Sequence, residues 1–296
     1  MSSFSGKTAV ISGGAAGIGL NLAETFGKQG MNIVLADIES AELAVAEKKL
    51  QDLGIPVLAV EMDVALREDW VRTADAAVER FGGIHLLVNN AGVSGGIGAI
   101  ETLDDAGWRW CMDVNVMGVV YGANVIVPIM KAQGEGGWVV NVASMAGMGG
   151  VPFAGAYTAS KAAVVALSES WGLELKPQGI HVSVLAPAFV RTRIHQSYRN
   201  RPARYPMEVA PTPDVMEVAK VTTQAVENGI DVDLVGRRVL EALEAGEFYI
   251  FTHPTYKVIT DGRSASVAKA FDQAAASPVV KDVDEQPSLG FGEPQK

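Results

Sequence analysis

Cysteine is almost absent from this sequence, with Cys111 the only one among 296 residues. A single thiol cannot close a disulfide within the chain, and such sparse use of cysteine suits a reducing compartment. No histidine stands at a metal-ligand spacing from Cys111, so we interpret it as a buried structural thiol. We therefore expect neither a disulfide framework nor a metal site.

Long apolar runs are also missing, although hydrophobic residues make up 48% of the chain. A bilayer-spanning helix needs about 18 apolar residues in succession. The richest stretch, Val119–Met130, is broken by Gly122, Asn124 and Pro128, so we interpret it as a buried helix. Residues 1–7 lack the basic and apolar segments of a secretory signal. We therefore expect a cytoplasmic protein without a membrane partner.

Positive charge is scarce, because 24 Lys and Arg residues stand against 34 Asp and Glu residues, for a net charge of -10. This excess of acid would repel phosphate backbones and anionic membrane surfaces. Nucleic acid is therefore not an expected partner, and a small molecule is the expected ligand.

What the sequence does contain is a regular alternation of short β-branched runs with longer amphipathic stretches. This alternation predicts a single α/β domain built on a doubly wound parallel sheet, the Rossmann fold. The expected strands are Thr8–Ser12, Asn32–Asp37, Val57–Glu61, Leu86–Asn89, Trp138–Ala143, His181–Ala186 and Phe248–Phe251.

The alternation lapses over residues 187–231, where Pro202, Pro206, Pro211 and Pro213 interrupt a mixed apolar and basic segment. Such excursions in a compact domain are usually functional, so we interpret this segment as a substrate lid. Residues 279–296 are polar, acidic and without periodicity, which predicts a loosely held tail. The expected catalytic domain therefore spans residues 1–278.

A glycine-rich loop follows the first expected strand, with Gly13, Gly17 and Gly19 in a Gly-x-x-x-Gly-x-Gly pattern that includes Ile18. Glycine lets the backbone approach a pyrophosphate, and the N-terminus of the next helix favours its negative charge. A purely structural glycine turn is the alternative. The position of the loop at the start of a βαβ unit favours a dinucleotide site.

The second expected strand ends in Asp37, where the dinucleotide fingerprint places a carboxylate that accepts hydrogen bonds from the adenosine ribose. A carboxylate there repels a 2′-phosphate, and Ala16 and Ile38 supply no basic partner for one. The sequence therefore favours NAD over NADP. A solvated aspartate at a strand end is the alternative.

Tyr157 and Lys161 stand four residues apart, so on a helix they share one face. A free tyrosine has a pKa of about 10 and is a poor base at neutral pH. A neighbouring ammonium favours the phenolate. We therefore interpret the pair as a general acid/base; an ordinary tyrosine in an alanine-rich helix is the alternative.

Together these motifs resemble the short-chain dehydrogenase/reductase family, and the resemblance runs from about Lys7 to Phe251. Ser12 and Ala188 depart from it, because the family usually has threonine and glycine there. The residues that carry it are the glycine loop, Asp63-Val64, Asn89-Asn90-Ala91-Gly92, Asn115, Ser144, Tyr157 to Lys161 and Pro187 to Thr192.

The resemblance implies a catalytic set of four residues. Ser144, at the end of the fifth strand, would steady the substrate oxygen as charge develops. Asn115 would bend its helix locally and hold a water that links Lys161 to solvent. Tyr157 would exchange a proton with the substrate. For Asn115, a buried structural asparagine is a compatible reading.

The same resemblance implies the contacts to NAD. The set comprises Asp63 and Val64 at the adenine, Asn89, Ala91 and Gly92 at the adenosine ribose, Tyr157 and Lys161 at the nicotinamide ribose, and Pro187, Val190 and Thr192 around the carboxamide. Holding the carboxamide orients one face of the ring toward the substrate.

The expected substrate wall is mainly apolar, which favours a hydrophobic or aromatic secondary alcohol or ketone. It comprises residues 94–97 and 145–153, Phe189, and the 187–231 segment with Ile194, Tyr198, Tyr205 and Met207. We interpret the lid arginines, namely Arg191, Arg193, Arg199, Arg201 and Arg204, as a solvated face; pairing with an acidic substrate tail is the alternative. His85, His181, His195 and His253 are expected to be packing or surface residues.

Three further expectations concern function and assembly. The lid and the C-terminal extension are similar to bacterial dehydrogenases of benzylic alcohols in aryl ethers. A catalytically idle NAD-binding sensor or scaffold is the alternative function, although four intact catalytic residues argue against it. The helices expected at residues 104–131 and 156–176 pair across a two-fold axis in the family, which implies a homotetramer or homodimer.

Overall fold

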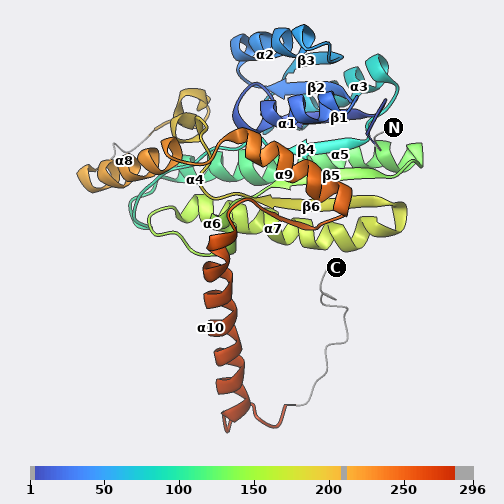
Figure 1. Ribbon diagram of the computed structural model, residues 1–296. Coiled ribbons are helices and arrows are strands. Elements are labelled where there is room, and N and C mark those ends of the chain that lie inside the picture. The colour runs from blue at the N-terminus through green and yellow to red at the C-terminus, as the bar shows by residue number, and fades with distance from the viewer. Residues whose placement is uncertain (1–3, 208–211, 284–296) are drawn as a thin grey trace.

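Seven parallel strands form one sheet in the order β3-β2-β1-β4-β5-β6-β7 (Figure 1). The computed structural model describes residues 4–207 and 212–283. The predicted doubly wound parallel sheet is confirmed, and the strand bounds differ from the expected ones by a residue at most. The strands are β1 Thr8–Ser12, β2 Asn32–Asp37, β3 Val57–Glu61, β4 Leu86–Asn89, β5 Gly137–Val142, β6 Ile180–Ala186 and β7 Tyr249–Phe251.

Helices cover both faces of this sheet and bury their apolar sides against it. On one face α1 (Gly17–Lys28), α2 (Ser40–Asp52) and α9 (Val232–Ala245) pack against the sheet through buried side chains such as Phe26 and Val239. On the other, α3 (Arg67–Phe81), α5 (Gly118–Gln133) and α7 (Gly155–Leu175) pack against the sheet through buried side chains such as Trp70 and Val164. Truncating one of these fully buried side chains to alanine costs about 2–5 kcal/mol of stability.

The strand order reverses between β1 and β4, and this reversal positions the ligand site. Open parallel sheets bind ligands outside the carboxyl ends of the strands at such a switch point, because the crossovers on either side leave in opposite directions. The loops that follow β1, β4, β5 and β6 therefore meet at one edge of the sheet.

The helix before α5 changes its winding. α4 (Asp105–Met112) runs into a π-helical turn, Asp113–Met117, before α5 begins. By length and composition the helix Asp105–Gln133 is apolar enough to cross a membrane, but half of that apolar window is buried inside the molecule. The helix contacts α3, α7 and β4, as a core helix does.

The lid segment, residues 187–231, lies over the same edge and is partly helical. Its described parts contain a 3₁₀ helix, Ile194–Asn200, and α8 (Pro213–Glu227), which Thr212 caps. Shorter elements elsewhere are α6 (Met145–Met148) and 3₁₀ turns at Lys176–Gln178 and Pro254–Tyr256.

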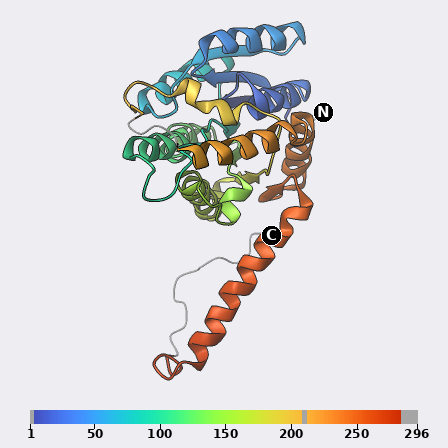
Figure 2. The same ribbon diagram turned by 90° about the vertical axis from the view of Figure 1, so that its left-hand side faces the viewer.

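The last helix, α10 (Lys257–Ala276), runs away from the body of the molecule, as two perpendicular views show (Figures 1 and 2). None of its residues is buried. The boundary proposed at residue 278 falls two residues after this helix ends, and most of the expected tail, residues 284–296, lies outside the described residues.

Candidate active site

A cleft of about 530 Å³ opens at the carboxyl edge of the sheet and collects most of the predicted site residues. Its walls combine the glycine loop, the ends of β2 to β6, the start of α7 and the lid. The predicted residues that line it are Gly13, Gly17, Ile18, Asp37, Asp63, Val64, Ala91, Gly92, Ser144, Tyr157, Lys161, Pro187, Val190 and Thr192. Gly19, Asn89 and Asn115 do not line it.

The glycine loop fits a pyrophosphate. Gly13 and Gly17 have φ of +62° and +54°, in the left-handed region that favours glycine. A Cβ on Gly19 would lie 2.1 Å from the Gly13 carbonyl oxygen, so this position also excludes other residues. Ala16, the N-cap of α1, makes no side-chain capping bond. The first N–H groups of α1 therefore stay available for an anion.

Ser12 and Asn90 brace this loop against the next strand of the switch point. The Asn90 Nδ2 donates to the carbonyl oxygens of Ser12 (2.9 Å) and Gly13 (3.0 Å). The Ser12 Oγ accepts from the backbone N–H groups of Asn90 (3.0 Å) and Ala91 (3.1 Å). Serine at the family's threonine position thus performs a structural role through its hydroxyl.

Asn89 points away from the cleft, whereas its neighbour Asn90 lines it. The Asn89 Nδ2 donates to the Asn141 Oδ1 at 2.8 Å, deep between β4 and β5. Asn89 is paired with Asn141 in the register of these strands, and successive side chains of a strand face opposite sides. The sequence analysis assigned Asn89 and not Asn90 to the cofactor site. The alternation of side chains along a strand was the signal that could have shown that only one of the two faces the cleft.

Asp37 lies at the end of β2 with its carboxylate tied to the backbone. Its Oδ2 accepts from the Ala15 N–H and its Oδ1 from the Glu39 N–H, both at 3.0 Å. Burial raises the pKa of Asp37, and these two hydrogen bonds oppose the rise. The carboxylate therefore stands beside the glycine loop, at one end of the cleft.

Ser144 and Tyr157 meet at the opposite end of the cleft. The Ser144 side chain accepts from the Ala146 N–H at 3.1 Å, so it also caps α6. Burial raises the pKa of Tyr157 to about 12, and the hydrogen bond with Ser144 lowers it in part. Tyr157 thus carries its proton at neutral pH in this structure.

Lys161 follows Tyr157 by one helical turn, as expected, but its ammonium turns toward the strand. Its Nζ donates to the Val142 carbonyl oxygen at 2.8 Å and lies 5.7 Å from the centre of the Tyr157 ring. Burial lowers the pKa of Lys161 to about 8. The expected lowering of the tyrosine pKa by this lysine is therefore not found, because burial of the Tyr157 hydroxyl sets the direction of its pKa.

Asn115 lies behind the cleft in the middle of the π-helical turn. Its Oδ1 accepts from the Val93 N–H at 2.8 Å, and its Nδ2 donates to the Val93 carbonyl at 2.9 Å and the Ser160 Oγ at 3.0 Å. A Cβ on Gly92 would lie 3.4 Å from both the Asn115 Oδ1 and the Lys161 Nζ. Asn115 therefore supports the loop against which Lys161 lies.

The lid arginines meet carboxylates of the protein itself. Arg193 pairs with Glu42, Arg199 with Glu39 and Arg204 with Asp63, so the lid is tied to the segments after β2 and β3. The distances are 3.1 Å for Arg193–Glu42, 2.5 Å for Arg199–Glu39, 2.6 Å for Arg204–Asp63, 2.7 Å for Arg191–Asp231 and 3.4 Å for Arg201–Asp104. The Arg201 side chain is only 6% exposed, so the reading of a solvated face does not fit it.

The end of the cleft near Ser144 and Tyr157 is largely apolar, but its composition differs from the wall that we expected for the substrate. Tyr198 and Tyr205 turn away, donating to the Gly95 carbonyl (2.9 Å) and the Asp113 carboxylate (2.7 Å). Side chains that sequence reasoning did not place there line it instead. They include Tyr256 and Ile259 from the start of α10, and His195, expected to be a packing or surface residue, lines the cleft from the lid.

Comparison with known proteins agrees with this geometry. The sequence pattern of the family described as short chain dehydrogenase matches residues 7–203. A CLA biosynthesis dehydrogenase/reductase of Lactiplantibacillus plantarum is 33% identical over 270 residues, which cover 89% of this chain and 93% of that protein. A C alpha-dehydrogenase of Sphingobium sp. is 34% identical over 260 residues, covering 86% and 83%.

A solved structure is similar over nearly the same span. The crystal structure of a short chain dehydrogenase/reductase from Burkholderia phymatum in complex with NAD matches with a TM-score of 0.88 and 38% identity. The match covers 91% of this chain and 97% of that one. The resemblance expected from the motifs is confirmed, including the similarity to a C alpha-dehydrogenase.

Proposed function

We propose, from the premise that this chain belongs to the short-chain dehydrogenase family, that it interconverts a secondary alcohol and a ketone with NAD as its cofactor. The observation that carries the proposal is the meeting of Ser144, Tyr157 and Lys161 at one end of a cleft whose other end is a glycine loop. The names of the relatives, which are dehydrogenases and reductases, support the same reaction class.

When bound, NAD would supply the hydride acceptor or donor at its nicotinamide ring. The chain's own residues handle the proton. In ketone reduction the Tyr157 hydroxyl, protonated at neutral pH, donates to the substrate oxygen, and the Ser144 hydroxyl donates a hydrogen bond to the same oxygen. In alcohol oxidation Tyr157 must first lose its proton, and the Lys161 ammonium nearby favours that loss.

The preference for NAD rests on Asp37. Its carboxylate stands beside the glycine loop, where the 2′-hydroxyl of an adenosine ribose would be its hydrogen-bond donor. A 2′-phosphate in the same place would meet a negative charge at short range. The neighbouring Glu39 pairs with Arg199, so that arginine is already neutralised by an acidic partner.

The substrate class follows from the lining of the other end of the cleft. Ile97, Met145, Val151, Phe189 and Ile259 dominate it, which supports a hydrophobic or aromatic alcohol. The lid arginines face protein carboxylates, so an acidic tail on the substrate would have to displace one of these.

Two properties of the whole protein belong to the same proposal. We propose a cytoplasmic location, because one buried cysteine suits a reducing environment. We also propose a homotetramer or homodimer that pairs α4–α5 and α7 across two-fold axes. Leu173 on α7 is 46% exposed and would be covered in such a contact.

Absorbance at 340 nm tests the reaction. The purified protein is given NAD and, in turn, aliphatic, alicyclic and benzylic secondary alcohols, with the Tyr157→Phe variant as the control. Turnover by the wild type and not by the variant is expected for at least one benzylic or alicyclic member. If NAD binds but no member of the panel or its ketone turns over, the idle NAD-binding alternative replaces this proposal.

A further inference from the structure

Three large apolar side chains that line the cleft are also open to solvent. Val151, Phe189 and Ile259 are 44%, 39% and 37% exposed, whereas Met145, further inside, is only 6% exposed. They come from the loop after α6, the loop after β6 and the first turn of α10, and together they form the apolar mouth of the cleft. Ile38, which is equally exposed, lines the cleft after β2, at the opposite end.

Close packing joins two of these segments. A Cβ on Gly149 would lie 2.7 Å from the Ile259 side chain, so the first turn of α10 lies against the loop that carries Val151. One helical turn further along, the Arg263 Nη1 donates to the Met148 carbonyl oxygen at 3.3 Å. α10 therefore begins directly beside α6 (Figure 1).

The third segment is joined to α10 through His253. The Ala188 N–H donates to the His253 Nδ1 at 3.4 Å, next to Phe189. The ring of His253 lies 5.5 Å from the ring of Tyr256, which lines the cleft just before α10 begins. The three residues of the apolar mouth therefore belong to one continuous set of contacts.

The loop of Val151 is also held from its other side. The Gly98 N–H donates to the Phe153 carbonyl oxygen at 2.8 Å. Phe153 has a φ of +61°, and it is the one residue other than glycine with a positive φ among the described residues. Such a conformation persists only where the surrounding structure imposes it. Val151 is therefore fixed in place before a ligand binds, which favours binding.

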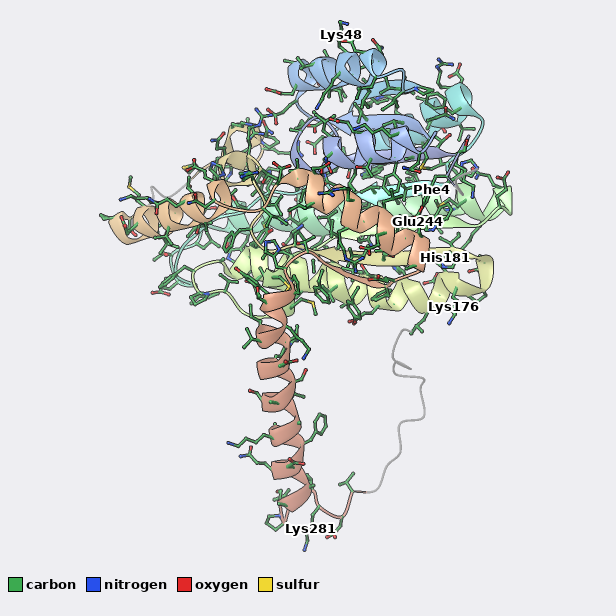
Figure 3. All side chains as sticks on the ribbon, viewed as in Figure 1. Phe4, Lys48, Lys176, His181, Glu244 and Lys281 are labelled. Atoms are coloured by element: carbon green, nitrogen blue, oxygen red, sulfur yellow. The ribbon has the colours of Figure 1, made fainter. Side chains whose placement is uncertain are left out.

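Only the start of α10 can border the cleft. Beyond its first turn the helix leaves the body of the molecule, and Lys281 lies past its far end, well away from the sheet (Figure 3). Val258 and Phe271 are 70% and 73% exposed and do not line the cleft. Exposed apolar residues scattered singly need no explanation, whereas a group of them at a cleft marks a binding site for a ligand.

We propose that the apolar mouth binds an extended apolar chain of the substrate, which runs out of the enclosed part of the cleft. The inference rests on the proposed function, because the reacting carbon must lie beside Ser144 and Tyr157. Ser144 caps α6 and Gly149 ends it, so the mouth begins about 7 Å from Ser144 along this helix. The substrate class is a secondary alcohol or ketone with a long apolar chain on one side of the reacting carbon.

A series of 2-alkanols that differ only in chain length, from 2-butanol to 2-decanol, tests the inference with NAD present. Complete burial of one CH2 group favours binding by about fourfold, and the mouth covers a chain on one side only. We therefore expect kcat/KM to rise about twofold for each added CH2 group, up to the longest member. A kcat/KM that is the same for 2-hexanol and 2-decanol overturns the inference.

Two variants place a charge in the apolar mouth. In Ile259→Asp the ratio of kcat/KM for 2-decanol over 2-butanol should fall by at least about tenfold, because a carboxylate keeps its water and repels the chain. Val258→Asp, the next residue on the same helix but outside the cleft lining, is the matched control. Val151→Asp repeats the test on a separate segment, with Val45→Asp on the exposed side of α2 as its control. Mouth variants that keep the wild-type ratio, or controls that lose it equally, contradict the inference.

Calorimetry separates the inference from the proposed function. The Kd of each 2-alkanol is measured with and without NADH, a pair that cannot react. Binding that tightens with chain length in a protein without turnover supports the apolar site and removes the reaction. Turnover without any dependence on chain length removes the apolar site and keeps the reaction. A lower mass of Ile259→Asp or Val151→Asp in light scattering also overturns the inference, because the mouth is then a contact between subunits.

Discussion

Tyr205 of the lid donates a 2.7 Å hydrogen bond to the carboxylate of Asp113, the first residue of the π-helical turn that carries Asn115. Its neighbour Arg204 pairs with Asp63, which lines the cleft just after β3. One short stretch of the lid therefore touches both the expected adenine wall and the turn that supports the catalytic end. Movement of the lid would therefore displace both Asp63 and the π-helical turn that carries Asn115.

Replacing Tyr205 by phenylalanine removes this tie while keeping the ring. Because a hydrogen bond to a charged group is worth about 1.5–3 kcal/mol, we expect kcat/KM to fall by about tenfold or more. Steady-state kinetics measure the effect. Tyr249→Phe is the control, since Tyr249 makes a similar bond to Glu169 away from the cleft. Equal losses in the two variants would remove Tyr205 from any role in the site.

Tyr157→Phe removes the proton donor and keeps the aromatic ring. NAD binding and the fold should survive, while kcat falls by far more than tenfold. A variant that retains kcat within about tenfold of wild type, a change below about 1.4 kcal/mol in the barrier, would show that another group exchanges the proton. Cofactor binding, followed by fluorescence, separates loss of chemistry from loss of structure.

The cofactor preference can be inverted at the end of β2. Wild type should have a higher kcat/KM with NAD than with NADP. Changing Asp37 to Ser and Ile38 to Arg removes the repulsion and adds a charged donor for a 2′-phosphate. The ratio of the two kcat/KM values should shift toward NADP by at least about tenfold, or about 1.4 kcal/mol. An unchanged ratio would place Asp37 away from the ribose.

Burial of Lys161 predicts how the free energy of unfolding changes with pH. Burial lowers the pKa of Lys161 to about 8, whereas an unfolded lysine titrates near about 10.4. Between these values the unfolded state binds more protons, so this group adds stability as pH rises from 8 to 10.4. The free energy of unfolding of wild type minus that of Lys161→Met should therefore rise by up to about 3 kcal/mol across this window. Urea unfolding measures it, and Lys48→Met, at an exposed site, should show no such trend.

Local patterns explain what could be predicted from the sequence. A short β-branched run predicts each strand, and helical spacing alone predicts that Tyr157 and Lys161 share one face of their helix. The glycine loop is recognisable because its backbone conformation admits few other residues, as the positive φ of Gly13 and Gly17 shows. All of these features depend on residues close in the chain.

Features that depend on distant residues were not predictable in this way. The partners of Arg193, Arg199 and Arg204 lie 151, 160 and 141 positions earlier in the chain, and no spacing rule connects such distant residues. The turning of Asn89 into the core depends on its pairing with Asn141 across two strands. The contribution of Tyr256 and Ile259 to the cleft depends on the path of the chain after β7.

The ion pairs from Arg193, Arg199 and Arg204 bridge the lid to the segments after β2 and β3, and each is partly open to solvent. Pairs of this kind contribute at most about 1 kcal/mol each, so together they form a latch that thermal motion opens often. Because added salt shortens the range of such attractions to about 3 Å at 1 M, the latch should loosen as ionic strength rises. Dissociation of the dinucleotide would then be the step most sensitive to salt, and where release limits turnover, moderate salt would make the protein faster rather than slower.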